Sequence, residues 1–185
     1  MNPAERIALS RSFFQAMCEP LFLCTVMAND RPNGCVVTQV MQLSYSDTPL
    51  MGVALGKENL TCSMVCETKR FGLSYLEMRQ TKIAERFGLH SGREVNKFAE
   101  IAWQEREGIP LVTDVPGWAL FRVCHQIDVE THLLFIAALE SASPPTLPVL
   151  DRNMLLRISP DVANRLDPWD WLPDALHRGT LHVWC

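Results

Sequence analysis

The sequence predicts a mainly β protein with short helices, built as an antiparallel barrel or sandwich. Runs rich in β-forming residues recur along the chain, and polar turns of hairpin length separate most of them. The segments with helical periodicity are few and short. Strands joined by hairpins favour antiparallel layers over a parallel βαβ sheet.

The first third of the chain predicts one helix and one hairpin. Asn2 can cap a helix that ends near Pro20, because Pro3 suits a first turn and Glu5 stands three residues after the cap. Two strands follow, joined by a turn that contains Asn33-Gly34. The strands are LFLCTVM (21–27) and CVVTQVMQL (35–43), and the turn is ANDRPNG (28–34).

The central part of the chain alternates strands with short helices, and the last predicted strands form a long pair. We expect Gly88 to terminate the second of these helices. The predicted strands are 50–56, 71–76, 118–129 and 131–141, and the predicted helices are 57–68 and 81–88.

Length and composition bound the domain organisation. A chain of 185 residues with 48% hydrophobic residues fits one folded core. We expect a barrel domain over 1–148, because the Pro-rich segment SASPPTLP (141–148) breaks the pattern there. The extension 149–185 holds three of the five tryptophans, so we expect it to pack on the barrel or on a partner subunit, with a lid or a protein contact as alternatives.

Charge and apolar patterning exclude some classes of partner. The net charge of −4 gives no positive field that would gather nucleic acid or an anionic membrane surface. Apolar runs such as HLLFIAAL (132–139) are shorter than the roughly 20 residues that span a bilayer. The N-terminal stretch lacks the apolar core of a signal peptide, so we expect a cytoplasmic protein.

The cysteines are expected to be reduced, buried apolar side chains. Seven is an odd number, and most of them lie within apolar segments rather than in a disulfide pattern. Cys62 and Cys66 could share a helix face as two metal ligands, but no second pair of Cys or His at ligand spacing accompanies them. The sequence therefore predicts no metal site.

The segment ERFGLHSGREVNKF (85–98) has the composition of an anion-binding loop. It gathers Arg86, His90, Arg93 and Lys97 around two glycines. Turns rich in Gly, Ser and basic residues can present backbone N–H groups to an anion. A solvated connecting loop is the alternative interpretation.

Four blocks of the sequence carry a family resemblance. They are NGCVVTQVMQLSYSDTP (33–49), GKENLTCSMVCETKRFGLSYL (56–76), ERFGLHSGREVNKF (85–98) and GIPLVTDVPGWALFRVCHQIDVETHLLFIAALE (108–140). In order and spacing they resemble the flavin reductase-like proteins of the FMN-binding split-barrel fold. The likeness is to the branch of flavoredoxins and of the flavin-reductase domain of high-molecular-weight rubredoxin, and it covers residues 21–140.

The resemblance implies an antiparallel split β-barrel that binds FMN and passes electrons. Such proteins usually take hydride from NADH or NADPH and deliver electrons to flavin, a metal or a redox protein. A homodimer with the flavin near the subunit interface is also implied. The alternatives are an FMN-binding electron carrier without NAD(P)H activity, and a divergent split barrel that has lost its flavin.

The resemblance also implies that the FMN phosphate lies between two basic segments. The first stands where a strand gives way to a helix start, which offers a cation, polar side chains and backbone N–H groups. The second is the loop, whose guanidinium suits a phosphate. The alternatives are a solvated strand end for Lys57 and a surface ion pair with Glu94 or Glu100 for Arg93. The candidates are Lys57, Asn59 and Thr61 in the first segment, and Ser91, Arg93 and Lys97 in the second.

By the same resemblance, the flavin ring is expected along residues 38–42. His132 takes the position of the His in the family's Gly-Asp-His triplet, here Glu130-Thr131-His132, and is the candidate catalytic residue beside nicotinamide or flavin. The alternatives are core packing for Val40 and Met41, a core or interface histidine for His132, and a tight turn or flavin neighbour for Asn33-Gly34. The ring-binding candidates are Thr38, Gln39, Val40, Met41 and Gln42.

Overall fold

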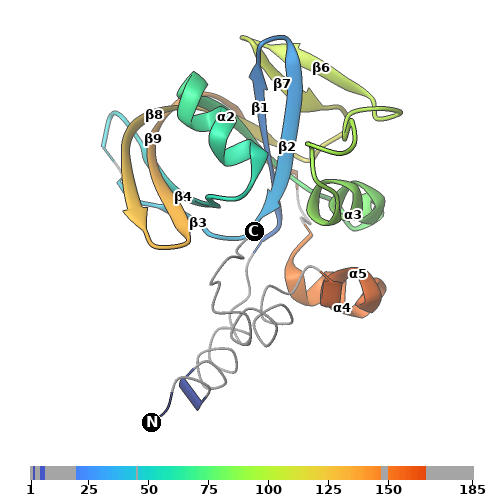
Figure 1. Cartoon of the computed structure of the whole chain (residues 1–185). Helices are drawn as coiled ribbons and strands as arrows, with labels where there is room; N and C mark the ends of the chain where they lie inside the picture. The colour runs from blue at the N-terminus through green and yellow to red at the C-terminus, as the bar shows by residue number, and fades with distance from the viewer. Residues whose placement is uncertain (1, 3–4, 7–19, 45, 147–149, 166–185) are drawn as a thin grey trace.

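The computed structural model describes residues 2, 5–6, 20–44, 46–146 and 150–165 (Figure 1). Most of the predicted first helix and residues 166–185 of the extension lie outside the described residues. Within the described ranges, no helix combines the length and the apolar content that a membrane span requires.

A curled antiparallel sheet of seven strands forms the body of the molecule (Figure 1). Its spatial order is β2-β1-β5-β8-β9-β4-β3, and a separate two-stranded hairpin, β6–β7, packs beside it. This arrangement with few short helices confirms the predicted fold class. The seven strands are β1 (Phe22–Ala28), β2 (Arg31–Val37), β3 (Val40–Gln42), β4 (Leu50–Gly56), β5 (Arg70–Tyr75), β8 (Trp118–Val129) and β9 (His132–Ser143).

The first hairpin turns earlier than the sequence predicted. Asn29 and Asp30 both adopt the left-handed conformation, with φ of 50° and 57°, and close a two-residue turn between β1 and β2. The predicted turn 28–34 and strand 35–43 are therefore wrong. Asn33 pairs with Val26 inside β2, and β2 and β3 are separate strands, because the Asn-Asp pair tolerates positive φ and leaves Asn33-Gly34 in extended backbone.

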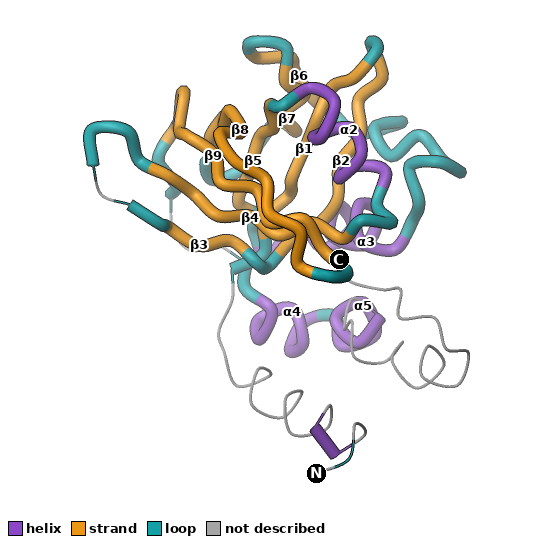
Figure 2. Tube along the Cα trace, turned by 60° about the vertical axis from the view of Figure 1, so that its left-hand side comes forward, coloured by secondary structure: helices purple, strands orange, loops and turns teal. Residues whose placement is uncertain are grey.

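The later strands and the two central helices follow the prediction closely. Helix 57–68 begins three residues late, as α2, and strands 118–129 and 131–141 are confirmed as β8 and β9. The β6–β7 hairpin and two helices near the C-terminal end were not predicted (Figure 2). The helices and the strands of the hairpin, predicted or not, are α2 (Leu60–Thr68), η1 (Met78–Gln80), α3 (Thr81–Leu89), β6 (Trp103–Arg106), β7 (Ile109–Val112), α4 (Arg152–Ile158) and α5 (Pro160–Arg165).

Strand β1 is buried on both faces, because alternate residues serve two apolar cores. Cys24 and Val26 face the main core, which α2 covers on the inner side of the curled sheet. Leu23 faces a second core beneath α3, and Leu150 and Leu155 join it. The described residues 150–165 of the extension therefore pack on the barrel.

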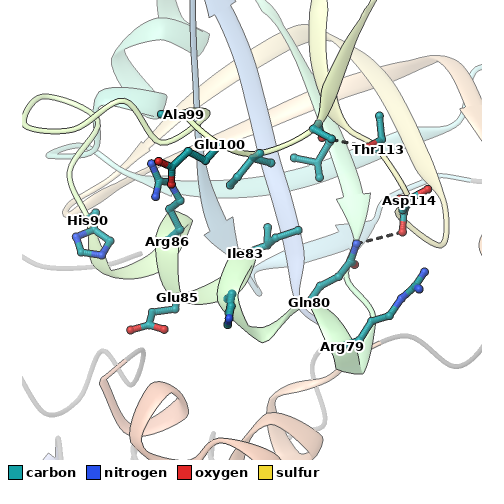
Figure 3. A pocket seen from close by; sticks show the side chains of 14 residues that line it. Arg79, Gln80, Ile83, Glu85, Arg86, His90, Ala99, Glu100, Thr113 and Asp114 are labelled. Carbon is teal, nitrogen blue, oxygen red and sulfur yellow. Dashed lines mark hydrogen bonds between the residues drawn. The ribbon is translucent and has the colours of Figure 1, made fainter.

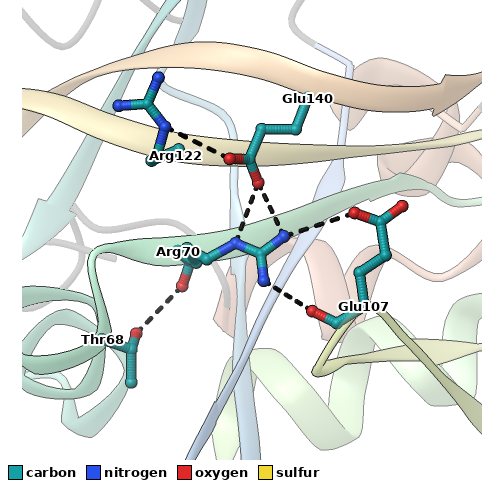
Figure 4. A network of polar contacts seen from close by, with 5 residues as sticks. All are labelled: Thr68, Arg70, Glu107, Arg122 and Glu140. Atoms are coloured by element: carbon teal, nitrogen blue, oxygen red, sulfur yellow. Dashed lines mark hydrogen bonds and ion pairs between the residues drawn. The ribbon is translucent and has the colours of Figure 1, made fainter.

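A network of charged side chains holds a bulge in the β8–β9 ladder (Figure 4). Glu140 is the extra residue of β9, because the register shifts between Leu120 and Phe121. Its Oε2 accepts hydrogen bonds from Nε and Nη2 of Arg70 at 2.9 and 2.8 Å, and its Oε1 lies 3.3 Å from Nε of Arg122. Arg70 and Arg122 are opposite each other on neighbouring strands, so Glu140 neutralises a like-charge pair.

The close approach of β7 to the sheet leaves no room for a side chain at Gly72. A methyl group there would lie 2.9 Å from Cγ2 of Ile109 and 2.9 Å from Cδ2 of Leu111, both buried. We expect Gly72→Ala to lower the free energy of unfolding by about 1–3 kcal/mol, measured by urea denaturation.

Gly52→Ala is the matched control, because its methyl group would meet only the exposed side chains of Met41 and Leu43, at 3.1 and 3.2 Å. Flexible side chains can move aside, so we expect a change within about 0.5 kcal/mol. Equal stability of the two variants would contradict the tight packing at Gly72.

Candidate functional site

The start of helix α2 presents backbone donors without an acidic neighbour in its first turn. Strand β4 ends at Gly56, and the chain turns through Lys57 and Glu58 into the N-cap residue Asn59. The Asn59 side chain makes no capping hydrogen bond, and the first turn of α2 carries no acidic residue. The N–H groups and the dipole of this turn therefore favour an anion.

The loop after α3 reaches this helix start. Nη1 of Arg93 donates to the carbonyl oxygen of Glu58 at 2.6 Å. Gly92 lies against Asn33, since a Cβ atom at Gly92 would lie only 2.1 Å from Oδ1 of Asn33. A side chain at position 92 would thus push the loop away. Of the predicted loop 85–98, Gly92 and Arg93 thus meet the first basic segment, 57–61, in space.

Strand β2 ties both segments together through Asn33 and Arg31. Asn33 is only 2% exposed, and its Nδ2 donates to Oγ1 of Thr61 at 3.0 Å. Nη2 of Arg31 donates to the carbonyl oxygen of Gly92. The sequence did not single out Arg31, because it fell within the predicted turn. The alternation of Arg31 and Asn33 on one strand face would have been the signal.

Lys57 pairs with a solvent-exposed carboxylate at the end of β8. Its Nζ lies 2.6 Å from Oδ1 of Asp128, and the hydrogen bond from Lys57 lowers the pKa of Asp128. The Lys57 and Asp128 side chains are 34% and 67% exposed, so solvent screens the pair. Another anion can therefore replace Asp128 as the partner of Lys57 with little loss of binding free energy.

The sheet register places His132 beside the start of α2. His132 on β9 pairs with Gly56 on β4, and the N–H of Lys57 donates to the carbonyl of Thr131 at 3.0 Å. Nδ1 of His132 lies 2.8 Å from Oγ1 of Thr131, which orients the half-buried ring. The candidate catalytic residue thus borders the first basic segment.

The ring-binding candidates run beside β4. The carbonyl of Gln39 accepts from the N–H of Ala54 at 3.1 Å, about 10 Å along the strand from Lys57. Val40 packs against the main core, whereas Met41 is 50% exposed and lies over Gly52. Thr38 is half-buried at the break between β2 and β3, and Gln42 donates to Ser44 from the exposed end of β3.

Ser91 and Lys97 lie in different surroundings, although both belong to the loop. Oγ of Ser91 accepts from the N–H of Arg93 at 3.2 Å and so shapes the turn. Lys97 is only 6% exposed, and its Nζ donates to the carbonyls of Gly34 and Phe87, each at 2.9 Å. The ammonium group faces the interior, so the structure does not bring Lys97 to the surface beside Arg93.

A cleft of about 680 Å³ lies between α3 and the chain around residues 99–102 and 112–114 (Figure 3). Arg79, Lys82 and Arg86 line one wall, whereas Glu100 and Asp114 stand on the other in the left-handed conformation, with φ of 63° and 59°. The cleft mixes both signs of charge and contains none of the phosphate candidates.

The cysteine pair on α2, Cys62 and Cys66, has no third ligand type gathered with it among the described residues. Within the described part of the chain, no three His, Cys, Asp or Glu side chains gather in a way that could hold a metal ion. Burial raises the pKa of Cys62 to about 12, so its thiol is protonated at neutral pH. Cys62 therefore behaves as a buried apolar side chain.

Comparison with known proteins identifies relatives by sequence. The flavin reductase like domain family matches residues 14–153. A high molecular weight rubredoxin from Moorella thermoacetica is 33% identical over 126 residues, which is 66% of this chain and 55% of the relative. A ferric-chelate reductase (NAD(P)H) from Archaeoglobus fulgidus is 34% identical over 119 residues, 63% of this chain and 70% of the relative. The chain thus spans about half the length of the first of these relatives.

A solved structure with the same fold is the FMN-binding protein from Thermus thermophilus. It superposes with a TM-score of 0.68 at 21% identity, covering 74% of this chain and 82% of that protein. At this identity the likeness establishes the fold, and the function must be argued from the site. Because the family match extends over most of the sequence, from residue 14 to 153, the chain belongs to the flavin reductase-like family.

Proposed function

We propose that this protein binds FMN and transfers electrons from NADH or NADPH through it to a flavin, a metal or a protein acceptor. The observation that carries the proposal is the hydrogen bond from Arg93 to the Glu58 carbonyl, which brings the loop to the start of α2, directly after Lys57. Two relatives support it, one named as an NAD(P)H-dependent reductase and the other as an FMN-binding protein.

The donor set fits a dianionic phosphate. A guanidinium has five N–H donors, and one N–H of Arg93 is committed to the Glu58 carbonyl, so others remain for phosphate oxygens. Lys57 would exchange its screened contact with Asp128 for the phosphate. Asn33 and Thr61 would not contact the phosphate directly. Their buried hydrogen bond would hold the start of α2 in position. Lys97 is not assigned a direct contact, because its ammonium faces inward.

When bound, FMN would supply the ring that accepts hydride, and the chain would position it. The backbone of Gln39 and the neighbouring residues 38–42 would border the ring along β4. His132, oriented by Thr131, would border the position of the nicotinamide and exclude water from it. Hydride transfer needs close, shielded stacking rather than an acid–base pair, so this positioning is the main contribution of the protein.

We also propose a homodimer, formed through the outer face of β3, β4, β9 and β8. The register puts Met41, Ile136 and Ile127 on this face, opposite the face that holds the main core. Met41, Leu43, Ile127 and Val129 are 50%, 42%, 45% and 43% exposed. A contiguous exposed apolar sheet face is typical of a protein interface.

The first prediction of the proposed function concerns colour and reduction. We expect the purified protein to absorb as a flavoprotein and the flavin band to bleach when NADH or NADPH is added without oxygen. Colour without bleaching by either nucleotide would favour the electron carrier. Absence of bound flavin, together with no binding of added FMN, would overturn the proposal.

The second prediction tests the phosphate ligands. Lys57→Ala and Arg93→Ala should each weaken FMN binding by about 2 kcal/mol, because each removes a charge-assisted contact. Neither side chain lies in a core, so the thermal unfolding midpoint should move little. Lys82→Ala removes an exposed cation of α3 and is the matched control. Unchanged FMN affinity in both variants would remove the phosphate assignment.

The third prediction tests the dimer. Ile127→Glu places a charge on the apolar outer face and should raise the dimer dissociation constant by at least about 30-fold, measured by sedimentation velocity. Val95→Glu changes an equally exposed apolar side chain on the loop and should leave the assembly intact. A monomeric wild-type protein, or equal effects of both variants, would contradict this interface.

A further inference from the structure

Two buried cysteines face each other across the first hairpin. Cys24 on β1 is the register partner of Cys35 on β2, and both side chains belong to the main core. Facing residues of antiparallel strands project to the same side of the sheet, with Cα atoms about 4.5–5.5 Å apart. A disulfide accepts Cα separations of roughly 4.4–6.8 Å. Both residues are thiols in this structure, and they lie where a disulfide can form without a large movement of either strand.

The sulfur of Cys35 has the surroundings of a reactive thiolate. A hydrogen bond from Cys24 is the largest of the effects that lower the pKa of Cys35. Burial raises this pKa, whereas the charge of Lys97 and a hydrogen bond from Thr61 lower it further. The ammonium group of Lys97 is held in place by the carbonyl of Gly34, directly before Cys35, at 2.9 Å. Burial lowers the pKa of Lys97, and the charge of Cys35 opposes that decrease, so the two groups stabilise each other as an ion pair.

A neighbouring thiol of the same core is in the opposite condition. Burial is the main cause that raises the pKa of Cys62 to about 12, so this thiol stays protonated at neutral pH. The thiolate, not the thiol, is the nucleophilic form of cysteine. Cys35 is therefore the core thiol that an oxidant meets in reactive form, and Cys24, which is hydrogen-bonded to it, is in position to react second.

We propose that Cys35 and Cys24 form an oxidation site, at which hydrogen peroxide converts the two thiols into a disulfide between β1 and β2. In the first step the sulfur of Cys35 attacks one peroxide oxygen, the O–O bond breaks, and the other oxygen takes up a proton and leaves as water. In the second step the sulfur of Cys24 attacks the sulfenic acid on Cys35, the S–O bond breaks, and the oxygen leaves as water with the proton of Cys24. In total two thiols lose two electrons and two protons, and one peroxide becomes two water molecules.

The burial of the pair selects the oxidant. Cys24 and Cys35 are 0% and 4% exposed. Oxidised glutathione would have to form a mixed disulfide with Cys35, for which a close-packed core has no room. Hydrogen peroxide is little larger than water and can enter through small local openings of the edge strand β2. The site should therefore respond to peroxide and not to a large disulfide.

This modification does not require a bound flavin, and it goes beyond the proposed function. The disulfide would join β1 to β2 covalently and remove the negative charge that faces Lys97. Cys35 lies two residues after Asn33 on the same strand, and Thr61 forms hydrogen bonds with both. Oxidation would thus change the core directly beside the contact that supports the start of α2.

The test treats the purified protein, as isolated, with hydrogen peroxide, unfolds it in an alkylating reagent and maps its peptides by mass spectrometry. We expect a peptide pair that joins Cys24 to Cys35, and we expect oxidised glutathione not to produce it. In Cys24→Ser, which keeps a hydrogen-bond donor but cannot form the disulfide, a sulfenic acid should accumulate at Cys35 and be trapped by dimedone. Absence of this trapped product would contradict the assigned order of the two cysteines.

Lys97→Gln should slow formation of the disulfide by about tenfold or more, because a neutral amide no longer favours the thiolate. Lys82→Gln removes the same charge from the exposed side of α3 and is the matched control, with an unchanged rate. Equal rates in Lys97→Gln and the wild type, a disulfide from Cys35 to Cys62, or oxidation confined to other cysteines would each overturn the proposal. If Lys97→Gln does not fold, the wild-type peptide map and Cys24→Ser still decide it.

Discussion

One buried hydrogen bond, from Nδ2 of Asn33 to Oγ1 of Thr61, sets the geometry on which the site depends. It joins an edge strand to the first turn of a helix, and both partners are almost fully buried. Breaking it would leave polar groups unsatisfied away from water, which costs more than the bond itself contributes. The side chain of Asn33 also supplies the surface on which Gly92 rests. The side chain of Asn33 therefore contacts strand, helix and loop at one point, and Arg31 and Arg93 add further hydrogen bonds between them.

The site concentrates positive charge in a protein whose net charge is negative. Arg31 and Arg93 bind backbone carbonyls, and within the part of the chain that the structure describes neither guanidinium pairs with a carboxylate. Among the described residues, Lys57 pairs with the screened carboxylate of Asp128, and Lys97 donates to two backbone carbonyls. An anion at the start of α2 would meet a local field that the overall charge of −4 conceals. Recognition is thus a property of short contacts rather than of long-range attraction.

Much of the fold follows from the sequence, because strand pairs with clear turn signals leave few alternative strand pairings. The long pair β8–β9 was predicted to within two residues, and the fold class was right. The first turn was misplaced because Asn29-Asp30 and Asn33-Gly34 are both good turn sequences, and only the pairing with β1 chooses between them. The β6–β7 hairpin escaped notice because β6 is exposed along its whole length and shows no alternation.

The candidate site was only partly accessible to sequence reasoning. The composition of segments 57–61 and 85–98 indicated cations and small residues, but contact between the two segments depends on the packing of Gly92 on Asn33. The inward direction of Lys97 could not be read from a loop that also contains exposed cations. Arg31 could be predicted as a site residue only if the first turn was placed correctly. Because the turn was misplaced, Arg31 was assigned to it and not to a strand face.

The second irregularity of the β8–β9 ladder, at Cys124, decides which side of the sheet the end of β8 presents. Phe121 and Val123 point inward, but after the extra residue the odd-numbered positions, Ile127 among them, point outward. Loss of that single residue would invert the parity of the strand end and send its polar side chains to the other surface. In this stretch the chain tolerates changes of side chain far better than changes of length.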